Sequence, residues 1–271
     1  MTLDEALNSG RGVERPFQCE EHADSNASAS VNVDKGVWVC YACGARGTIN
    51  GHVPSPEAAI RILAGDEDPR VYPELWLDIF DAYEPSQYWA DRYGYDVAAL
   101  NRCGTDARTG DPTYPMRGPH GEVWGVVRRQ ADSQPKYVYP DGVSVSRTVY
   151  GNLDRKPVCV LVEGASDVMA LEESGIPDHW SVWGCYGAGL KLPQIELLAE
   201  RSPKLVVIAF DDDDAGHKAT DRASDALEDI APFVWHQWGK VGVKDAGELR
   251  KDQRVAAIRS SLNDNGYAKY L

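Results

Sequence analysis

A buried strand that ends in a run of carboxylates is the feature that most restricts the fold of this chain. Residues 205–225 read LVVIAFDDDDAGHKATDRASD. The six apolar residues have the length and branching of a strand inside a parallel sheet, and four aspartates follow them directly. Open α/β sheets bind ligands at the carboxyl ends of their strands, and adjacent negative charges repel one another unless water or a cation separates them. The stretch therefore predicts a cation site at a sheet edge.

The register of the aspartate run sets the directions of its side chains. Because side chains alternate along an extended backbone, we expect Asp211 and Asp213 to point to one side and Asp212 to the other. Asp214 stands before a helical pattern that reaches about residue 230, which makes it the expected N-cap. An isolated run of aspartates is more often a solvated turn, so a metal site needs a second observation.

An earlier stretch of the same shape supplies that observation. Residues 157–171 read PVCVLVEGASDVMAL, a second buried strand that ends in Glu163 and leads into a helix with Asp167. Two adjacent parallel strands would bring Glu163, Asp211 and Asp213 to the same edge of one sheet.

The second half of the chain alternates strand and helix patterns, as an α/β fold with a parallel sheet requires. An amphipathic helix is expected after this alternation, at 246–262. Further strands are expected near 181–185 and 233–238, and helices at 166–174, 193–201 and 214–230.

Two pairs of soft metal ligands lie near the N-terminus. Cys19-x2-His22 is followed after seventeen residues by Cys40-x2-Cys43, and a hairpin pattern lies between the pairs. This spacing is typical of a closed tetrahedral zinc site, which can fold a domain too small for a core of its own. The alternative is three buried cysteines and an incidental histidine. Cys103 has no partner cysteine and is expected to be buried, and Cys159 and Cys185 lie on expected strands and are expected in the core.

Charge is distributed unevenly along the chain. A net charge of −14 argues against a general nucleic-acid binder, but residues 102–156 carry 9 basic against 6 acidic side chains. Basic groups at strand ends or turns of this segment can reach phosphate oxygens, although such spacing more often marks a solvated sheet face. These candidates are Arg117, Arg128, Arg129, Lys136 and Arg147.

The two acidic stretches, EGASD and DDDDAG, resemble the two signatures of a Toprim domain. The zinc pattern, which ends in CYACGARG, resembles the zinc ribbon of DnaG-type primases. It lies about a hundred residues before the acidic half, whereas the zinc motif of RecR-type proteins lies much closer to the Toprim segment. The order Pro-x-Arg, Gly-x-x-x-Arg, Pro-Lys-Tyr and Tyr-Gly in the basic segment resembles the basic half of the same primase core.

The resemblance implies roles for these side chains. Mg²⁺ or Mn²⁺ would be held by Glu163, Asp167, Asp211, Asp213 and Asp245, with Glu163 as a ligand or as the acceptor of the primer hydroxyl's proton. Cys19, His22, Cys40 and Cys43 would hold Zn²⁺. The triphosphate and the template backbone would be held by Arg117, Arg129, Lys136 and Arg147, with Arg128 as the alternative to Arg129.

The sequence departs from the family pattern at two places. Asp212 stands where the family has glycine, and Gly247 replaces the second acidic residue of a motif that begins at Asp245. The resemblance implies an α/β (α+β overall) architecture: a zinc ribbon at 1–52, a linker at 53–73, the basic part of the polymerase core at 74–156, a Toprim subdomain at 157–240 and a helical segment at 241–271.

The expected function is that of a DNA primase, which makes short RNA primers from nucleoside triphosphates on single-stranded DNA by two-metal nucleotidyl transfer. A replicative helicase and a DNA polymerase are the expected further partners. The small size suggests a phage-encoded form. No apolar run reaches the roughly 18 residues that span a membrane, and the N-terminus lacks a signal-peptide pattern, so a cytoplasmic protein is expected. The alternatives are a Toprim nuclease and a non-catalytic zinc-containing recombination mediator.

Overall fold

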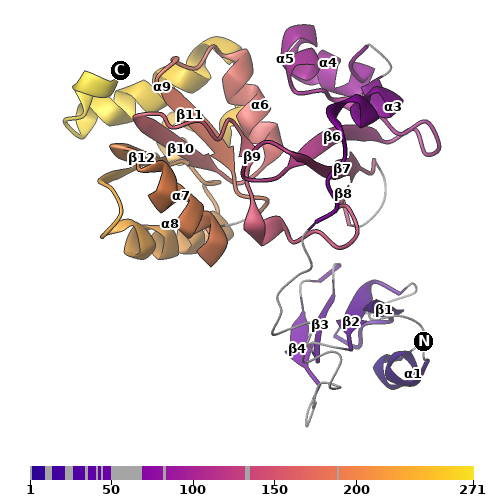
Figure 1. Cartoon of the computed structure of the whole chain (residues 1–271). Coiled ribbons are helices and arrows are strands. Elements are labelled where there is room, and N and C mark those ends of the chain that lie inside the picture. Colours follow the sequence, from indigo (N-terminus) through magenta and orange to yellow (C-terminus); the bar gives the residue numbers. More distant parts are fainter. Residues whose placement is uncertain are drawn as a thin grey trace. The chain divides into compact units, whose positions relative to one another are not determined.

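The chain divides into two compact units in a computed structural model (Figure 1). One unit comprises residues 1–69 and 129–142, and the other comprises residues 70–128 and 143–271. The helices of the described residues include none with the length and apolar character needed to cross a membrane. The structure describes residues 2–9, 14–21, 27–33, 36–40, 42–43, 45–49, 69–81, 84–131, 135–187 and 189–271.

The first unit contains a four-stranded antiparallel sheet with strands in sequence order. Helix α1 (Leu3–Asn8) begins at a capping box in which Thr2 and Glu5 bond each other's backbone amides. The predicted hairpin is confirmed, with Val31 opposite Trp38. The strands are β1 (Glu14–Phe17), β2 (Ala29–Asn32), β3 (Val37–Cys40) and β4 (Arg46–Thr48), and β8 (Tyr137–Val138) also falls in this unit.

The second unit is built on the predicted parallel sheet. Its strand order is β13-β12-β10-β11-β9, and all neighbours are parallel except the antiparallel edge strand β9. The predicted α/β alternation is confirmed, with helix ends within three residues of expectation except at the last helix, which begins at Lys251 rather than at Ala246. The strands are β9 (Tyr150–Gly151), β10 (Val158–Val162), β11 (Trp180–Gly184), β12 (Leu205–Ile208) and β13 (Phe233–Trp235); the helices are α6 (Ala165–Glu173), α7 (Leu192–Arg201), α8 (Asp214–Leu227) and α9 (Lys251–Asp264).

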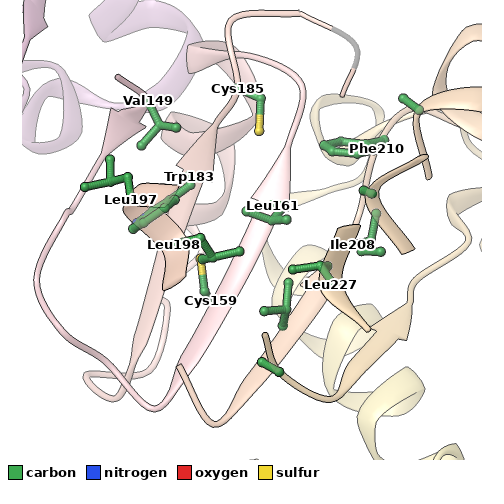
Figure 2. Close-up of a cluster of buried hydrophobic side chains, with 14 residues drawn as sticks. Val149, Cys159, Leu161, Trp183, Cys185, Leu197, Leu198, Ile208, Phe210 and Leu227 are labelled. Carbon is green, nitrogen blue, oxygen red and sulfur yellow. The ribbon is translucent and has the colours of Figure 1, made fainter. Parts of the chain in front are cut away.

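Both faces of this sheet are covered, which explains why its central strands are apolar throughout. Leu161 and Ile208 pack on one face with Leu198 of α7 and Leu227 of α8 (Figure 2). Helices α6 and α9 pack together on the other face (Figure 1). Cys103, Cys159 and Cys185 are buried, as expected.

The remainder of the second unit combines short helices with an antiparallel sheet. The predicted helical region at 74–101 is divided into several short helices, and Gly94 ends one of them at a φ of 86°. Ring contacts from Trp89 to Tyr114 and from Tyr114 to Tyr150 connect a helix, this sheet and β9. The elements are η1 (Glu74–Leu77), α3 (Asp78–Asp81), α4 (Gln87–Tyr93), α5 (Tyr95–Leu100), β5 (Gly104–Thr105), β6 (Pro112–Arg117), β7 (Val123–Arg129) and η2 (Val145–Arg147).

Candidate functional site

Carboxylates from separate segments gather at the carboxyl edge of the parallel sheet. β10 and β12 are neighbours, with Leu161 opposite Ile208, so the chain leaves both strands at the same edge. One oxygen each of Asp167, Asp211 and Asp245 lies within 4.8 Å of the other two. Asp167 comes from the first turn of α6, and Asp245 precedes the short helix η4 (Ala246–Glu248). This carboxylate trio is compact enough for one cation to contact all three side chains.

Asp213 is engaged differently from the trio. It is the N-cap of α8, and its Oδ1 accepts hydrogen bonds from the amides of Ala215 and Gly216, both at 2.9 Å. The predicted N-cap, Asp214, is therefore wrong: Asp213 keeps the extended backbone that a cap requires, and Asp214 is the first helical residue. The Gly216 amide and the nearby Lys244 ammonium lower the pKa of Asp213.

Lys244 is a site residue that the sequence analysis missed. Its Nζ lies 3.1 Å from Asp211 Oδ2 and 3.0 Å from Asp213 Oδ2. These two carboxylates raise the pKa of the Lys244 ammonium. The sequence feature that marks it is the Lys-Asp pair at 244–245, of which only Asp245 is predicted above as a site residue. The carboxylate of Asp212 instead accepts a hydrogen bond from His217.

The pKa values of three carboxyl groups at the site are raised. Burial, and then the charges of Asp211 and Asp213, raise the pKa of Glu163 to about 7. Burial, and then the charges of Asp211 and Asp245, raise the pKa of Asp167 to about 7. Burial also raises the pKa of Asp211. The buried Glu163 Oε1 lacks a hydrogen-bond partner among the described residues. Crowded, desolvated carboxylates of this kind fit a divalent cation, which would favour their charged forms.

These raised pKa values predict how the stability of the metal-free protein depends on pH. An acid whose folded-state pKa is raised holds its proton more tightly when folded, so its stabilisation is lost as pH rises through the folded pKa. With chelator present, we expect the melting temperature to fall between about pH 4.5 and pH 7. The Glu163→Gln, Asp167→Asn double variant should show a flatter profile. Identical profiles would show that these groups do not titrate in this window.

Gly216, in the first turn of α8, lies in close contact with the backbone of Asp211. A methyl group at this position would lie 2.0 Å from the Asp211 carbonyl oxygen. We expect Gly216→Ala to destabilise the protein by about 1–3 kcal/mol, as other overpacked sites do. Ala215→Ser, on the exposed side of the same turn, should change stability by less than about 0.5 kcal/mol. Urea denaturation measures both, and equal effects would show that the close approach is not rigid.

The predicted basic residues already have partners in the structure. Arg117 donates from Nη1 and Nη2 to Glu74 at 2.8 and 2.7 Å. Arg128 Nη1 lies 3.3 Å from Asp111 Oδ2. The Arg147 guanidinium lies 5.8 Å from the ring centroid of Trp124, in the same unit as the carboxylate trio.

Arg129 and Lys136 fall in the first unit. The Nζ of Lys136 lies 5.4 Å from the ring centroid of Tyr137. That either Arg128 or Arg129 contacts a phosphate stays a prediction.

A second candidate metal centre lies in the first unit. Cys19, Cys40 and Cys43 each place a sulfur within 4.8 Å of the others, and the Cys19 and Cys43 sulfurs are 3.8 Å apart. Burial alone would raise the pKa of Cys40, but hydrogen bonds from Ser28 and from nearby backbone amides lower it to about 6. Burial raises the pKa of Cys19 in the same cluster to about 11, so the fit to zinc rests on the convergence of three sulfur ligands rather than on their pKa values. The fourth predicted ligand, His22, lies outside the described residues.

A family model described as Toprim-like matches residues 160–249, a range that contains all five candidate carboxylates. Curated DNA primases are similar over longer stretches. The protein of Synechococcus elongatus is 35% identical over 187 residues, which are 62% of this chain and 26% of that protein. The protein of Aquifex aeolicus is 27% identical over 229 residues, which are 80% of this chain and 41% of that protein. The chain thus spans about a quarter of the length of the first relative and about two fifths of the length of the second.

Solved structures show the same fold at low sequence identity. The zinc-binding and RNA polymerase domains of the Aquifex aeolicus primase align with a TM-score of 0.56 at 20% identity, over 97% of this chain and 83% of that one. The RNA polymerase domain of Mycobacterium tuberculosis primase DnaG aligns with a TM-score of 0.51 at 19% identity, over 65% and 74% of the two chains.

Proposed function

We propose that this chain, which is related to the DnaG-type DNA primases, makes short RNA primers from nucleoside triphosphates on a single-stranded DNA template. The observation that carries the proposal is the convergence of Asp167, Asp211 and Asp245 within 4.8 Å, inside the Toprim-like segment. Carboxylate oxygens are the ligands that Mg²⁺ and Mn²⁺ prefer. A nucleotidyl transferase needs such a site beside its reacting phosphate.

The trio would hold the divalent ion, with Asp213 and Glu163 as additional acidic groups. The bound ion would neutralise charge that develops on the phosphate oxygens. Glu163 would serve as a further ligand or would accept the proton of the primer 3′-hydroxyl. Its pKa of about 7 suits a general base at neutral pH.

The basic residues and the cysteine cluster would bind the remaining parts of the substrate complex. We assign the triphosphate and template phosphates to Arg117, Arg147, Lys136 and Arg129, with Arg128 as the alternative to Arg129. An arginine that exchanges a carboxylate partner for a phosphate keeps its charge compensated, so the Arg117 to Glu74 pair is compatible with this role.

Zinc held by Cys19, Cys40, Cys43 and His22 would fold a module that samples the template sequence. A relative's solved structure is described as a DnaG primase catalytic domain bound to single-stranded DNA, which supports a template of this kind. A replicative helicase and a DNA polymerase are the proposed protein partners. The boundary at residues 156–157 between the basic part of the core and the Toprim subdomain is also part of this proposal.

Primer synthesis on a mixture of single-stranded templates with labelled ribonucleotides tests the proposal. We expect short RNA products that require a divalent ion and a template. Degradation of the DNA without nucleoside triphosphates would instead indicate a nuclease that uses the same carboxylates. DNA binding without chemistry or divalent-ion affinity would indicate a recombination mediator.

A further inference from the structure

An ammonium group already occupies one position at the carboxylate site. Lys244 Nζ lies between Asp211 and Asp213, 3.1 and 3.0 Å from one oxygen of each. The proposed function does not need this contact, because divalent ions alone would neutralise the two aspartates. The Lys244 side chain is 46% exposed, so it has a route into solvent.

The backbone on both sides of Lys244 is fixed, so the contact is built into the fold. Its amide donates to Glu248 Oε2 at 2.8 Å, and its carbonyl accepts from the Asp212 amide at 2.8 Å. The Glu248 amide in turn donates to Asp245 Oδ1 at 3.1 Å. One short segment therefore presents both a cation, Lys244, and a metal-ligand candidate, Asp245, to Asp211.

Asp211 belongs to two groups of carboxylates that differ in what they offer a metal ion. In the first group, one oxygen each of Asp167 and Asp245 lies within 4.8 Å of an Asp211 oxygen. In the second group, Asp213 Oδ1 caps α8 and Asp213 Oδ2 contacts Lys244. Among the described residues the ion pairs of Lys244 are with Asp211 and Asp213, so an ion bound between these two aspartates requires Lys244 to leave, whereas Asp167 and Asp245 have no ammonium contact to lose.

We propose that Lys244 is an internal cation that a second divalent ion must displace, so that the resting site binds one ion at Asp167, Asp211 and Asp245 and admits another only as Lys244 withdraws. The proposal rests on the proposed function for the class of metal. An ammonium and a divalent ion compete for the same oxygens, so removal of the ammonium strengthens the second binding step. Lys244 is thus a positioning residue that controls how many ions the site holds.

Manganese binding to the full chain, followed by electron paramagnetic resonance without nucleotides, tests the inference. We expect one ion to bind tightly to the wild type and a second to bind weakly. In Lys244→Met the second ion should bind about tenfold more tightly or better, as the loss of roughly 1.4 kcal/mol of competition implies. Lys244→Arg keeps the charge and should resemble the wild type. Lys240→Met removes an exposed charge from the nearby helix η3 (Trp238–Val241) and should leave both affinities unchanged.

Equal second-ion affinity in Lys244→Met, Lys240→Met and the wild type would overturn the inference. Circular dichroism verifies that each variant is folded, and Lys244→Gln provides a second neutral replacement if the methionine variant is not. The outcome is separate from that of the proposed function. A chain that makes no RNA but shows the Lys244 effect disproves only the primase activity, and a primase without the effect disproves only the inference.

Discussion

Replacement of Asp211 with asparagine is expected to reduce primer synthesis by about three orders of magnitude, which corresponds to roughly 4 kcal/mol of lost transition-state stabilisation. Asp211 is the one carboxylate that belongs both to the trio and to the Lys244 contact. Asparagine keeps the shape of the side chain but loses the charge that attracts a divalent ion. The rate of labelled ribonucleotide incorporation measures the effect.

Asp212→Asn is the matched control for this variant. It removes the same charge from the adjacent position, but its carboxylate contacts His217 rather than the trio. We expect it to retain activity within a few-fold of the wild type. Similar losses in the two variants would indicate that the net charge of the turn, rather than cation binding at Asp211, sustains activity.

Replacement of Cys40 with alanine is expected to abolish zinc binding and to unfold the sheet of strands β1 to β4. Cys40 is fully buried beside Phe17 and Val31, so the variant loses core packing as well as a thiolate. Structural zinc contributes on the order of 10 kcal/mol to the folding of small metal domains, more than such a core supplies. Zinc content and limited proteolysis measure the loss.

The activity of the Cys40 variant distinguishes two roles of zinc. We expect loss of template selectivity and of primer initiation, while some extension of a preformed primer remains, because the carboxylate trio, Arg117 and Arg147 lie in the other unit. Equal loss of initiation and extension would indicate a purely structural zinc. Cys103→Ala, a buried cysteine outside the cysteine cluster, should keep its zinc.

The parallel sheet could be predicted because its cause is local. Buried β10 and β12 are apolar at every position, and the chain reaches an acidic residue, Glu163 or Asp211, within three residues of each strand's end. Their adjacency is a condition of the predicted carboxylate site, and the register of β10 with β12 meets it. The cap of α8 was misplaced by one residue, since several consecutive aspartates can all accept the capping bonds and only the backbone conformation selects Asp213.

Contacts between distant segments were the part that the sequence did not reveal. Lys244 reaches Asp211 from 33 positions away along the chain, and no periodic pattern encodes that approach. Arg117 likewise pairs with Glu74, which is separated from it by 43 positions. Side-chain chemistry identified these residues as charged, but the tertiary fold decides which charges meet.

Anomalous diffraction from manganese-soaked crystals of the wild-type chain tests the central claim most directly. We predict a peak with ligand distances of about 2.0–2.3 Å to carboxylate oxygens of Asp167, Asp211 and Asp245. Manganese bound elsewhere on the protein, with these three side chains separated from it, would contradict the account.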